Sequence, residues 1–325
     1  MDTEKTAQPF DPASFEHVPV LLNECLDGLK IDPAGTYLDG TAGGAGHSRQ
    51  IALRLNGEQG GRLISLDQDP DAVQTARARL AGLPATVVQI NFRYAGQALE
   101  QLGIETINGA LLDLGVSSHQ LDDAARGFSY RADAPLDMRM DTSAPLSAAD
   151  IVNTWSQEEL RRILFEYGEE RYAPAISRAI VRARETAPVK TTLELVEIIK
   201  AAIPARVRAE GGHPAKRTFQ AIRIELNHEL EVLDESIDTM VDLLNPGGRL
   251  SIITFHSLED RIVKTRFKTC ENPCICPPDF PVCVCGRKSR GKVVTRKPIV
   301  PSGQELEENT RSKSSKLRVF ERSGS

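Results

Sequence analysis

A loop with almost no side chains, Asp39-Gly-Thr-Ala-Gly-Gly-Ala-Gly-His47, lies between an apolar segment and a predicted helix. Such a loop lets a ligand contact backbone N–H groups at the start of the helix. The dinucleotide fingerprint needs glycines at n, n+2 and n+5, but Gly44 and Gly46 are followed at n+5 by Arg49. An acid before the glycines suits a ligand with an ammonium group and no pyrophosphate. The loop therefore predicts S-adenosylmethionine, which carries methyl-group chemistry, rather than NAD. A tight turn without a ligand is the alternative.

Polar or aromatic residues stand where the next predicted strands end. In a doubly wound sheet, ligands bind beyond the carboxyl ends of the strands, where the strand order switches. Asp67 is placed to accept two hydrogen bonds from a ribose diol, and Phe92 to lie against an adenine face. Asp113 would border the reacting centre, with Gln120 on the loop that follows. Each residue alone is as consistent with a helix cap or a surface position, but their repetition strand by strand indicates a cofactor site.

These residues require a parallel sheet with helices between its strands. After a first strand ending near Leu38, strands are predicted at 61–67, 85–91, 109–115 and 248–255, with two last strands at 292–295 and 316–321. A helix is expected from Pro70 to Leu80. About 130 residues separate the fourth and fifth strands, where a crossover needs a few tens, so an extra domain is inserted there. The predicted fold class is α/β, a Rossmann-like core at 1–125 and 215–325 with an inserted all-helical domain at 126–214.

Two features predict helices in the insert. Capping boxes at Ser156 and Thr191 mark helix starts. A single long helix from about Ala215 is expected to lead back to the sheet. Its apolar stripe consists of Phe219, Ile222, Leu226, Leu230 and Leu233.

The composition is that of a globular chain. It has 325 residues, 40% of them hydrophobic, and a formal net charge of −5. No run approaches the ~18 apolar residues of a membrane span, and the polar start from Met1 to Asp11 lacks the features of a signal peptide. We therefore expect a soluble, cytoplasmic protein with a loose N-terminal tail and no membrane partner. Between Lys264 and Lys297, nine Lys or Arg against two acids give a charge of +7, which suits a polyanion or a solvated surface.

Cysteine is concentrated in one segment, where Cys274, Cys276, Cys283 and Cys285 form two Cys-x-Cys pairs. Four thiolates at this spacing suit zinc, although the usual knuckle is Cys-x-x-Cys. Disulfides are less expected in a cytosolic chain. The remaining alternative is a proline-stiffened loop with buried thiols.

As a set, the motifs resemble those of one family, the bacterial small-subunit ribosomal RNA cytosine-N4 methyltransferases. The resemblance covers most of the chain and rests on His17–Glu24, Asp39–Ser48, Leu111–Ser118 with Gln120–Asp123, Arg126–Ser129, Asp137–Asp141, Pro214–Gln220, Phe255–Arg261 and the cysteine loop Cys274–Gly286. It implies the class I fold of S-adenosylmethionine-dependent methyltransferases. It also implies methylation of N4 of one cytosine, position 1402, in the decoding region of the 16S RNA of the small ribosomal subunit.

The resemblance implies a set of cofactor-binding residues that nearly coincides with the strand-end set: Ala45, Gly46, His47, Asp67, Phe92, Asp113 and Gln120. The family often has glycine at the position of Ala45 and proline at that of His119, and neither departure prevents backbone contact with the cofactor. Because this family is not known for metalloenzymes, the resemblance favours a cysteine loop without metal.

The substrate side is expected to involve both the sheet and the insert. N4 must lose a proton, and Asp113 is the expected catalytic acceptor, with a purely cofactor-binding role as the alternative. The base must also leave its stack. Phosphate contacts are expected from Arg139, Lys216, Arg217 and Arg223, and a base pocket from His256 and Ser257.

Two other function classes remain open on the sequence alone. One is a methyltransferase of the same fold that acts on protein or a small molecule. The other is a non-catalytic RNA-binding protein that keeps a vestigial cofactor fold. The sequence also leaves open the oligomeric state, a homodimer being one option, and whether naked RNA or an assembled subunit is the substrate.

Overall fold

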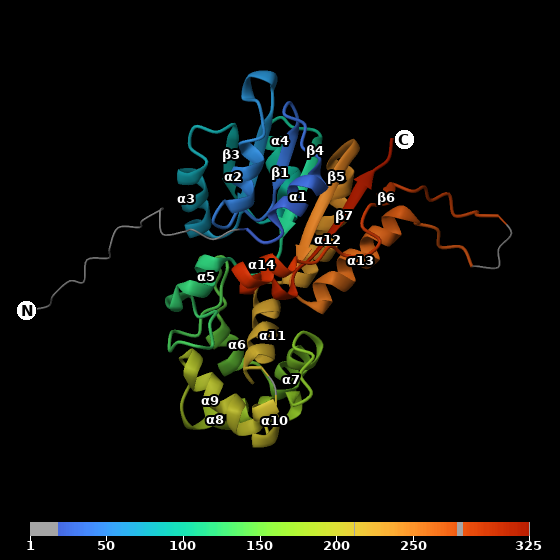
Figure 1. Cartoon of the computed structure of the whole chain (residues 1–325). Coiled ribbons are helices and arrows are strands. Elements are labelled where there is room, and N and C mark those ends of the chain that lie inside the picture. Colours follow the sequence, from blue (N-terminus) through green and yellow to red (C-terminus); the bar gives the residue numbers. More distant parts are fainter. Residues whose placement is uncertain (1–18, 211, 278–281, 325) are drawn as a thin grey trace, which may run out of the picture.

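The structure, a computed structural model, describes residues 19–210, 212–277 and 282–324. The predicted N-terminal tail and the first two residues of the motif at His17 lie outside these ranges. Figure 1 shows an α/β module joined to a helical module. Among the described residues, none of the helices combines the length and the apolar character that crossing a membrane requires.

The α/β module is built on a seven-stranded sheet in the order β3-β2-β1-β4-β5-β7-β6. The strands are β1 (Thr36–Asp39), β2 (Arg62–Asp67), β3 (Ala85–Gln89), β4 (Ile107–Asp113), β5 (Leu244–Thr254), β6 (Gly291–Val293) and β7 (Lys316–Arg322). Strands β1 to β5 are parallel, and β7 runs antiparallel to both of its neighbours. The order reverses between β1 and β4, so the carboxyl ends of these two strands mark the switch point where ligands bind. The predicted α/β class is confirmed.

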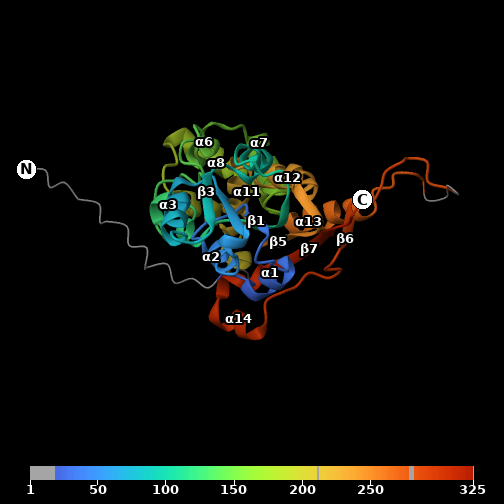
Figure 2. The same cartoon turned by 90° about the horizontal axis from the view of Figure 1, so that it is seen from above.

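Two apolar layers cover the two faces of the sheet, because alternate strand residues point to opposite sides. Leu38 and Ile64 pack on one side and Tyr37 and Leu63 on the other. The first side is covered by α4 (Ala95–Gln101), α12 (Glu229–Leu243) and α13 (Ser257–Glu271), and the second by α1 (Leu22–Leu29), α2 (Gly46–Ala52) and α3 (Pro70–Arg79). The view from above shows this layering (Figure 2). The short α14 (Gly303–Glu308) precedes β7.

Strand β5 begins earlier than predicted. The strand predicted at 248–255 already pairs at Leu244 with Ile107, and pairing resumes at Arg249 with Gly109. The four residues between bulge out of the ladder, with Gly247 at φ +81°, a conformation that glycine adopts without strain.

The helical module has its own hydrophobic core, formed by buried residues between Phe128 and Ile222. Its helices are α6 (Ala148–Thr154), α7 (Gln157–Glu166), α8 (Ala173–Thr186), α9 (Thr192–Ala202), α10 (Ala205–Glu210) and α11 (Lys216–Leu226), and the short α5 (Ser118–Asp122) comes just before it. Both predicted capping boxes are confirmed. The side chains of Ser156 and Thr191 each accept the backbone N–H of the residue at N3, and the glutamate at N3 accepts the backbone N–H of the capping residue.

The prediction of one long helix from Ala215 is wrong. Helix α11 ends before Asn227, and α12 starts after His228, which has the left-handed φ of 52°. Phe219 and Ile222 of α11 pack in the helical core, whereas α12 packs on the sheet through Leu233, Ile237 and others. The boundary predicted at residue 215 therefore falls at the start of a helix that packs in the inserted module.

Candidate cofactor and substrate site

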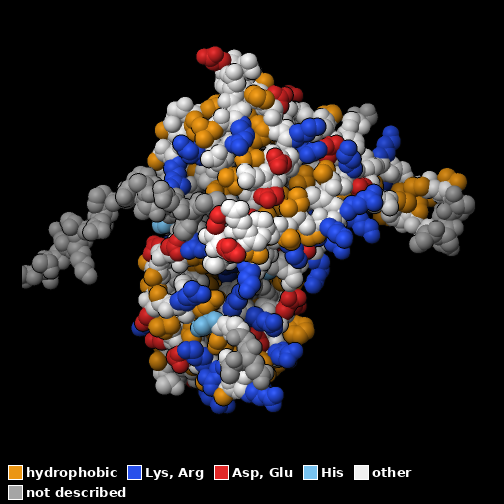
Figure 3. Space-filling view, viewed as in Figure 1, with side chains coloured by type: hydrophobic (Ala, Val, Ile, Leu, Met, Phe, Trp, Pro, Cys, Tyr) orange, Lys and Arg blue, Asp and Glu red, His pale blue; other side chains and the backbone are white. Residues whose placement is uncertain are grey.

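A cleft of about 880 Å³ lies where the carboxyl ends of the strands face the helical module. The sheet side contributes the glycine loop and the residues that follow β2, β3 and β4, and the helical side contributes Tyr130, Met140, Lys216 and Gln220. On the face shown in Figure 3, Lys and Arg side chains gather where the two modules meet. The cleft has two chemically different walls.

The glycine loop is braced by an acid that does not face the ligand. Asp39 is 1% exposed and is not part of the cleft lining. Its Oδ1 accepts the N–H of Thr41 at 3.0 Å and its Oδ2 accepts the hydroxyl of Ser48 at 2.6 Å. Burial raises its pKa. The expectation that Asp39 itself meets an ammonium group is therefore wrong, and its role is to hold the shape of the loop.

The end of the loop starts α2 without a side-chain cap. Ala45 occupies the N-cap position at φ 59° and is fully buried, so its side chain does not line the cleft, whereas Gly46 and His47 do. A Cβ on Gly46 would lie 2.6 Å from the ring of Pro19. Close packing therefore requires glycine here. The helix start remains open to a ligand.

Asp67 at the end of β2 lines the cleft as predicted. Its Oδ2 accepts the N–H of Gly43 at 2.8 Å and its Oδ1 that of Asp69 at 2.9 Å. Burial raises its pKa to about 6, against the lowering effect of these two N–H donors. A carboxylate oxygen has further acceptor capacity, so ribose hydroxyls can still bind.

His47 and Asp113 form a pair at the switch point. Nδ1 of His47 lies 3.4 Å from Oδ2 of Asp113, and Nε2 lies 3.0 Å from the carbonyl oxygen of Val20. Burial lowers the pKa of His47, but the contacts with Asp113 and the Cys25 thiol outweigh it and raise the pKa well above its ordinary value. Oδ1 of Asp113 is buried and has no hydrogen-bond partner among the described residues.

Phe92 and Gln120 complete the predicted cofactor side of the cleft. Phe92 starts a 3-10 turn directly after β3. Gln120 is 5% exposed, and its amide is engaged on both sides: Oε1 accepts the N–H of Ser117, and Nε2 donates to Oδ2 of Asp69 at 2.8 Å. The amide plane of Gln120 is therefore held in place before any ligand binds.

Sequence reasoning assigned no role to Arg126, which joins the two modules. Its buried guanidinium pairs with Asp69 at 2.8 Å and donates to the carbonyl oxygens of Arg139 and Met140. Asn227 binds the same strip of backbone, accepting the N–H of Met140 at 2.8 Å and donating to the carbonyl oxygen of Met138. In the sequence, Arg126 opens one of the motifs that resemble the family, but residue spacing alone gives no sign of these contacts.

The four basic residues predicted to contact phosphates have different environments. Lys216 is exposed and lines the cleft. Arg223 also lines the cleft, but both of its terminal contacts go to Glu229, at 2.7 and 2.9 Å. Arg139 and Arg217 are not part of the lining: Arg139 makes a bidentate pair with Asp137, and Arg217 donates to the carbonyl oxygen of Glu169. The structure therefore brings Lys216 and Arg223 to the cleft, but not the other two.

His256 and Ser257 follow β5 and line the cleft. The hydroxyl of Ser257 donates to Glu169 at 2.9 Å, and Nε2 of His256 lies 3.1 Å from Oε1 of Glu259. Burial acts to raise the pKa of Glu259, but His256 and the N–H of Phe255 hold it below its ordinary value.

Glu229, His256 and Glu259 are close enough to hold a cation, with ligand atoms within 4.8 Å of one another. Their carboxylates are already engaged, however. Glu229 pairs with Arg223. Glu259 accepts two backbone N–H groups, those of Phe255 and His256. These bonds favour a polar wall over a metal site.

The basic window is partly neutralised in the fold. Arg266 and Arg290 pair with acids of α12, and Lys292 pairs with Glu321 of β7. Three of the nine basic residues in this window therefore hold α13 and the segment around β6 to their neighbours.

A doubly wound sheet with β7 antiparallel, and strand-end acids around a glycine loop, defines the class I S-adenosylmethionine-dependent methyltransferases. The model of the MraW methylase family matches residues 14–323, and the chain belongs to this family. S-adenosylmethionine is its methyl donor. The predicted family, fold class and cofactor are thereby confirmed.

Relatives match along nearly the whole length. "Ribosomal RNA small subunit methyltransferase H" of Lachnospira eligens is 63% identical over 310 residues, covering 95% of this chain and 98% of that protein. "Ribosomal RNA small subunit methyltransferase H 2" of Agathobacter rectalis is 61% identical over 311 residues, with the same coverage of both chains. The protein of Brevibacillus brevis that carries the first of these names is 54% identical over 311 residues, covering 95% of this chain and 98% of its own.

Proposed function

We propose that this chain transfers a methyl group from S-adenosylmethionine to N4 of one cytosine, position 1402, in the decoding region of 16S ribosomal RNA. The names of its relatives support small-subunit ribosomal RNA as the substrate class. The observation that carries the proposal is the two-walled cleft, which faces the sheet's strand ends on one side and Tyr130, Lys216 and Gln220 of the helical module on the other.

The cofactor wall fits a ligand with a sulfonium centre, a ribose and an amino acid tail. Four glycines of the loop, Gly40, Gly43, Gly44 and Gly46, line the cleft without side chains, so a ligand there can approach the backbone. The Oδ1 atom of Asp113 is a buried acceptor without a donor among the described residues. We assign ribose contacts to Asp67, an adenine contact to Phe92, and contacts with the rest of the cofactor to the backbone around Ala45, Gly46 and His47. Gln120 supports this wall through Asp69.

The reaction forms a bond between N4 and the methyl carbon, breaks the bond from that carbon to sulfur, and releases one proton from N4. Because the N4 lone pair is delocalised into the ring, alignment must supply much of the rate. The bound cofactor supplies the electrophilic methyl group. Asp113 lies at the switch point, where its Oδ1 can accept the proton while His47 holds Oδ2.

The helical wall would receive the flipped base and its flanking nucleotides. Tyr130 lines the cleft and is itself held, stacked on His213 with ring centroids 4.3 Å apart. An aromatic face of this kind suits a base. Lys216 is placed for a phosphate, and His256 and Ser257 border the pocket. Arg223 contributes to this wall by holding the carboxylate of Glu229 in place.

The test is methyl transfer from labelled cofactor to naked 16S RNA, partly assembled subunits and mature subunits, with the methylated nucleotide located by mass spectrometry of nuclease fragments. We expect label on N4 of one cytosine with at least one of these substrates, and Asp113→Asn to lower kcat by about 10²–10⁴. Unchanged methylation of that cytosine in cells lacking the protein would refute the proposal. Absence of cofactor binding by the purified protein would instead favour a vestigial fold.

A further inference from the structure

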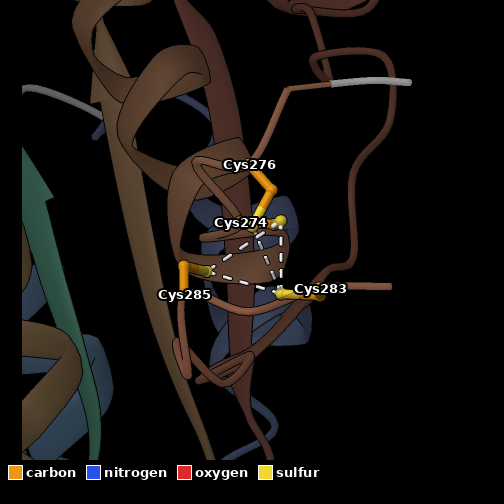
Figure 4. Close-up of side chains that lie close together, drawn as sticks. All are labelled: Cys274, Cys276, Cys283 and Cys285. Carbon is orange, nitrogen blue, oxygen red and sulfur yellow. Dashed lines mark hydrogen bonds between the residues drawn. The ribbon is translucent and has the colours of Figure 1, made fainter. Parts of the chain in front are cut away.

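The four clustered cysteines bring their sulfur atoms together. Sγ of Cys283 lies 3.5 Å from those of Cys274 and Cys285 and 3.9 Å from that of Cys276, and Cys285 lies 4.0 Å from Cys274. All four Sγ atoms lie within 4.8 Å of one another. Figure 4 shows them converging on one point from two segments of the loop between α13 and β6.

These separations match a mononuclear tetrahedral metal site. With a Zn–S bond of ~2.3 Å, tetrahedral geometry places the sulfurs about 3.8 Å apart. The four sulfur–sulfur distances given above, 3.5 to 4.0 Å, bracket this value, and the other two pairs lie within 4.8 Å. A cluster with two or more metal ions would spread the thiolates further apart, so the spacing points to one ion.

Little else in the loop can draw the four sulfurs together. The described residues between Asn272 and Arg290 form no helix or strand. The apolar residues beside the cysteines that the structure describes, Ile275, Val282 and Val284, are 65%, 70% and 72% exposed, so these three form no local core. Cys274 and Cys283 are exposed as well, which contradicts the alternative of a loop with buried thiols. A segment without a core needs a cross-link or a metal to adopt one structure.

The surroundings of the sulfurs also suit thiolates. The N–H of Val284 donates to Sγ of Cys276 at 3.4 Å, the kind of backbone contact that orients a metal ligand. Four thiolates carry more negative charge than one divalent ion neutralises, and Arg287 and Lys288 follow directly. The base of the loop is closed by the N–H of Arg290, which donates to the carbonyl oxygen of Cys270 at 2.9 Å.

We propose that Cys274, Cys276, Cys283 and Cys285 bind one zinc ion that folds the loop between α13 and β6. The resemblance favoured a loop without metal, but the sulfur geometry outweighs it. The loop projects from the α/β module in both views (Figures 1 and 2). Zinc therefore gives shape to a protruding segment with basic residues beside the metal.

The experiment measures metal in protein purified without an affinity tag under reducing conditions. We expect about one zinc per chain, reduced at least tenfold in the double variant Cys274→Ser/Cys283→Ser. The matched control is Cys270→Ser, which removes a thiol from the preceding helix and should retain the zinc. Cobalt substitution should give the intense visible bands of tetrahedral thiolate coordination in the parent protein but not in the double variant.

A second measurement keeps the proposal testable if the double variant fails to fold. Chelation of the parent protein should make the loop between residues 272 and 290 the first site of proteolysis, and added zinc should restore its resistance. Three outcomes would overturn the proposal: no zinc bound even after reconstitution, stoichiometric iron in place of zinc, or disulfides among these four cysteines in metal-free protein.

Discussion

Both ring nitrogens of His47 face acceptors, because Nδ1 lies 3.4 Å from Oδ2 of Asp113 and Nε2 lies 3.0 Å from the carbonyl oxygen of Val20. A neutral imidazole has one N–H and satisfies one acceptor, whereas an imidazolium satisfies both. The fold thus favours a protonated His47 beside the carboxylate of Asp113.

The raised pKa of His47 predicts a stability that declines at alkaline pH. The folded-state pKa lies well above the unfolded value. The stabilisation is therefore fully present below about pH 6.5 and is lost as pH rises through the folded pKa. Urea unfolding between pH 6 and 9 should show a fall in the free energy of unfolding, with a slope of up to about 1.4 kcal/mol per pH unit between the unfolded and the folded pKa. In His47→Gln this part of the decline should be missing; the same slope in both proteins would contradict the assignment.

The pKa of about 6 at Asp67 predicts a pH-dependent affinity for the cofactor. In the proposed complex, ribose hydroxyls would donate to the ionised carboxylate of Asp67, so protonation below this pKa would weaken binding. We expect the Kd for S-adenosylmethionine to be about tenfold higher at pH 5 than at pH 7. Calorimetric titration of the parent protein and Asp67→Asn tests this. The variant should bind weakly at both values, and a persistent pH effect in it would place the titrating group elsewhere.

The sequence predicted the sheet better than the site. Strand ends such as Asp67 and Asp113 were predictable because each is an acid that directly follows the last apolar residue of a largely apolar segment. The break between α11 and α12 after Asn227 was not predictable. The apolar stripe continues across it with helical spacing, and the left-handed backbone of His228 does not alter that spacing. Nor could spacing show that Asp39 turns inward, because its partner Ser48 becomes a neighbour through the shape of the loop.

Gly40 offers a test of packing at the cofactor wall. A Cβ there would collide with the buried Leu112 side chain and lie 3.0 Å from Cβ of Phe92. Gly40→Ala should therefore destabilise the fold by about 1–3 kcal/mol and raise the Kd for the cofactor by displacing Phe92. Gly303→Ala is the control, because a Cβ there meets nothing within 4 Å. Thermal unfolding and cofactor titration compare the two variants. The same Tm and cofactor Kd in both would argue against close packing around Gly40.

Lys216 and Arg139 should respond differently to removal. Lys216 is exposed in the cleft, so Lys216→Ala should weaken RNA binding and lower the slope of log Kd against log salt by about 0.7–0.9. The cofactor Kd should not change. Arg139→Ala breaks a pair with Asp137 and should lower stability by about 1 kcal/mol, while the salt slope stays as in the parent. Filter binding at several salt concentrations measures both slopes. A reduced slope for Arg139→Ala would indicate that Arg139 contacts RNA phosphate after all.

The chain passes between the two modules near Arg126 and near Asn227, and both side chains bind the same strip of backbone from Met138 to Met140. Movement that separates this strip from Arg126 and Asn227 would break a buried ion pair, one buried hydrogen bond and several partly buried ones. These contacts therefore constrain the width of the cleft before any substrate binds. An RNA that already presents a splayed nucleotide of the right shape can enter, and choice among RNAs depends on their own folding.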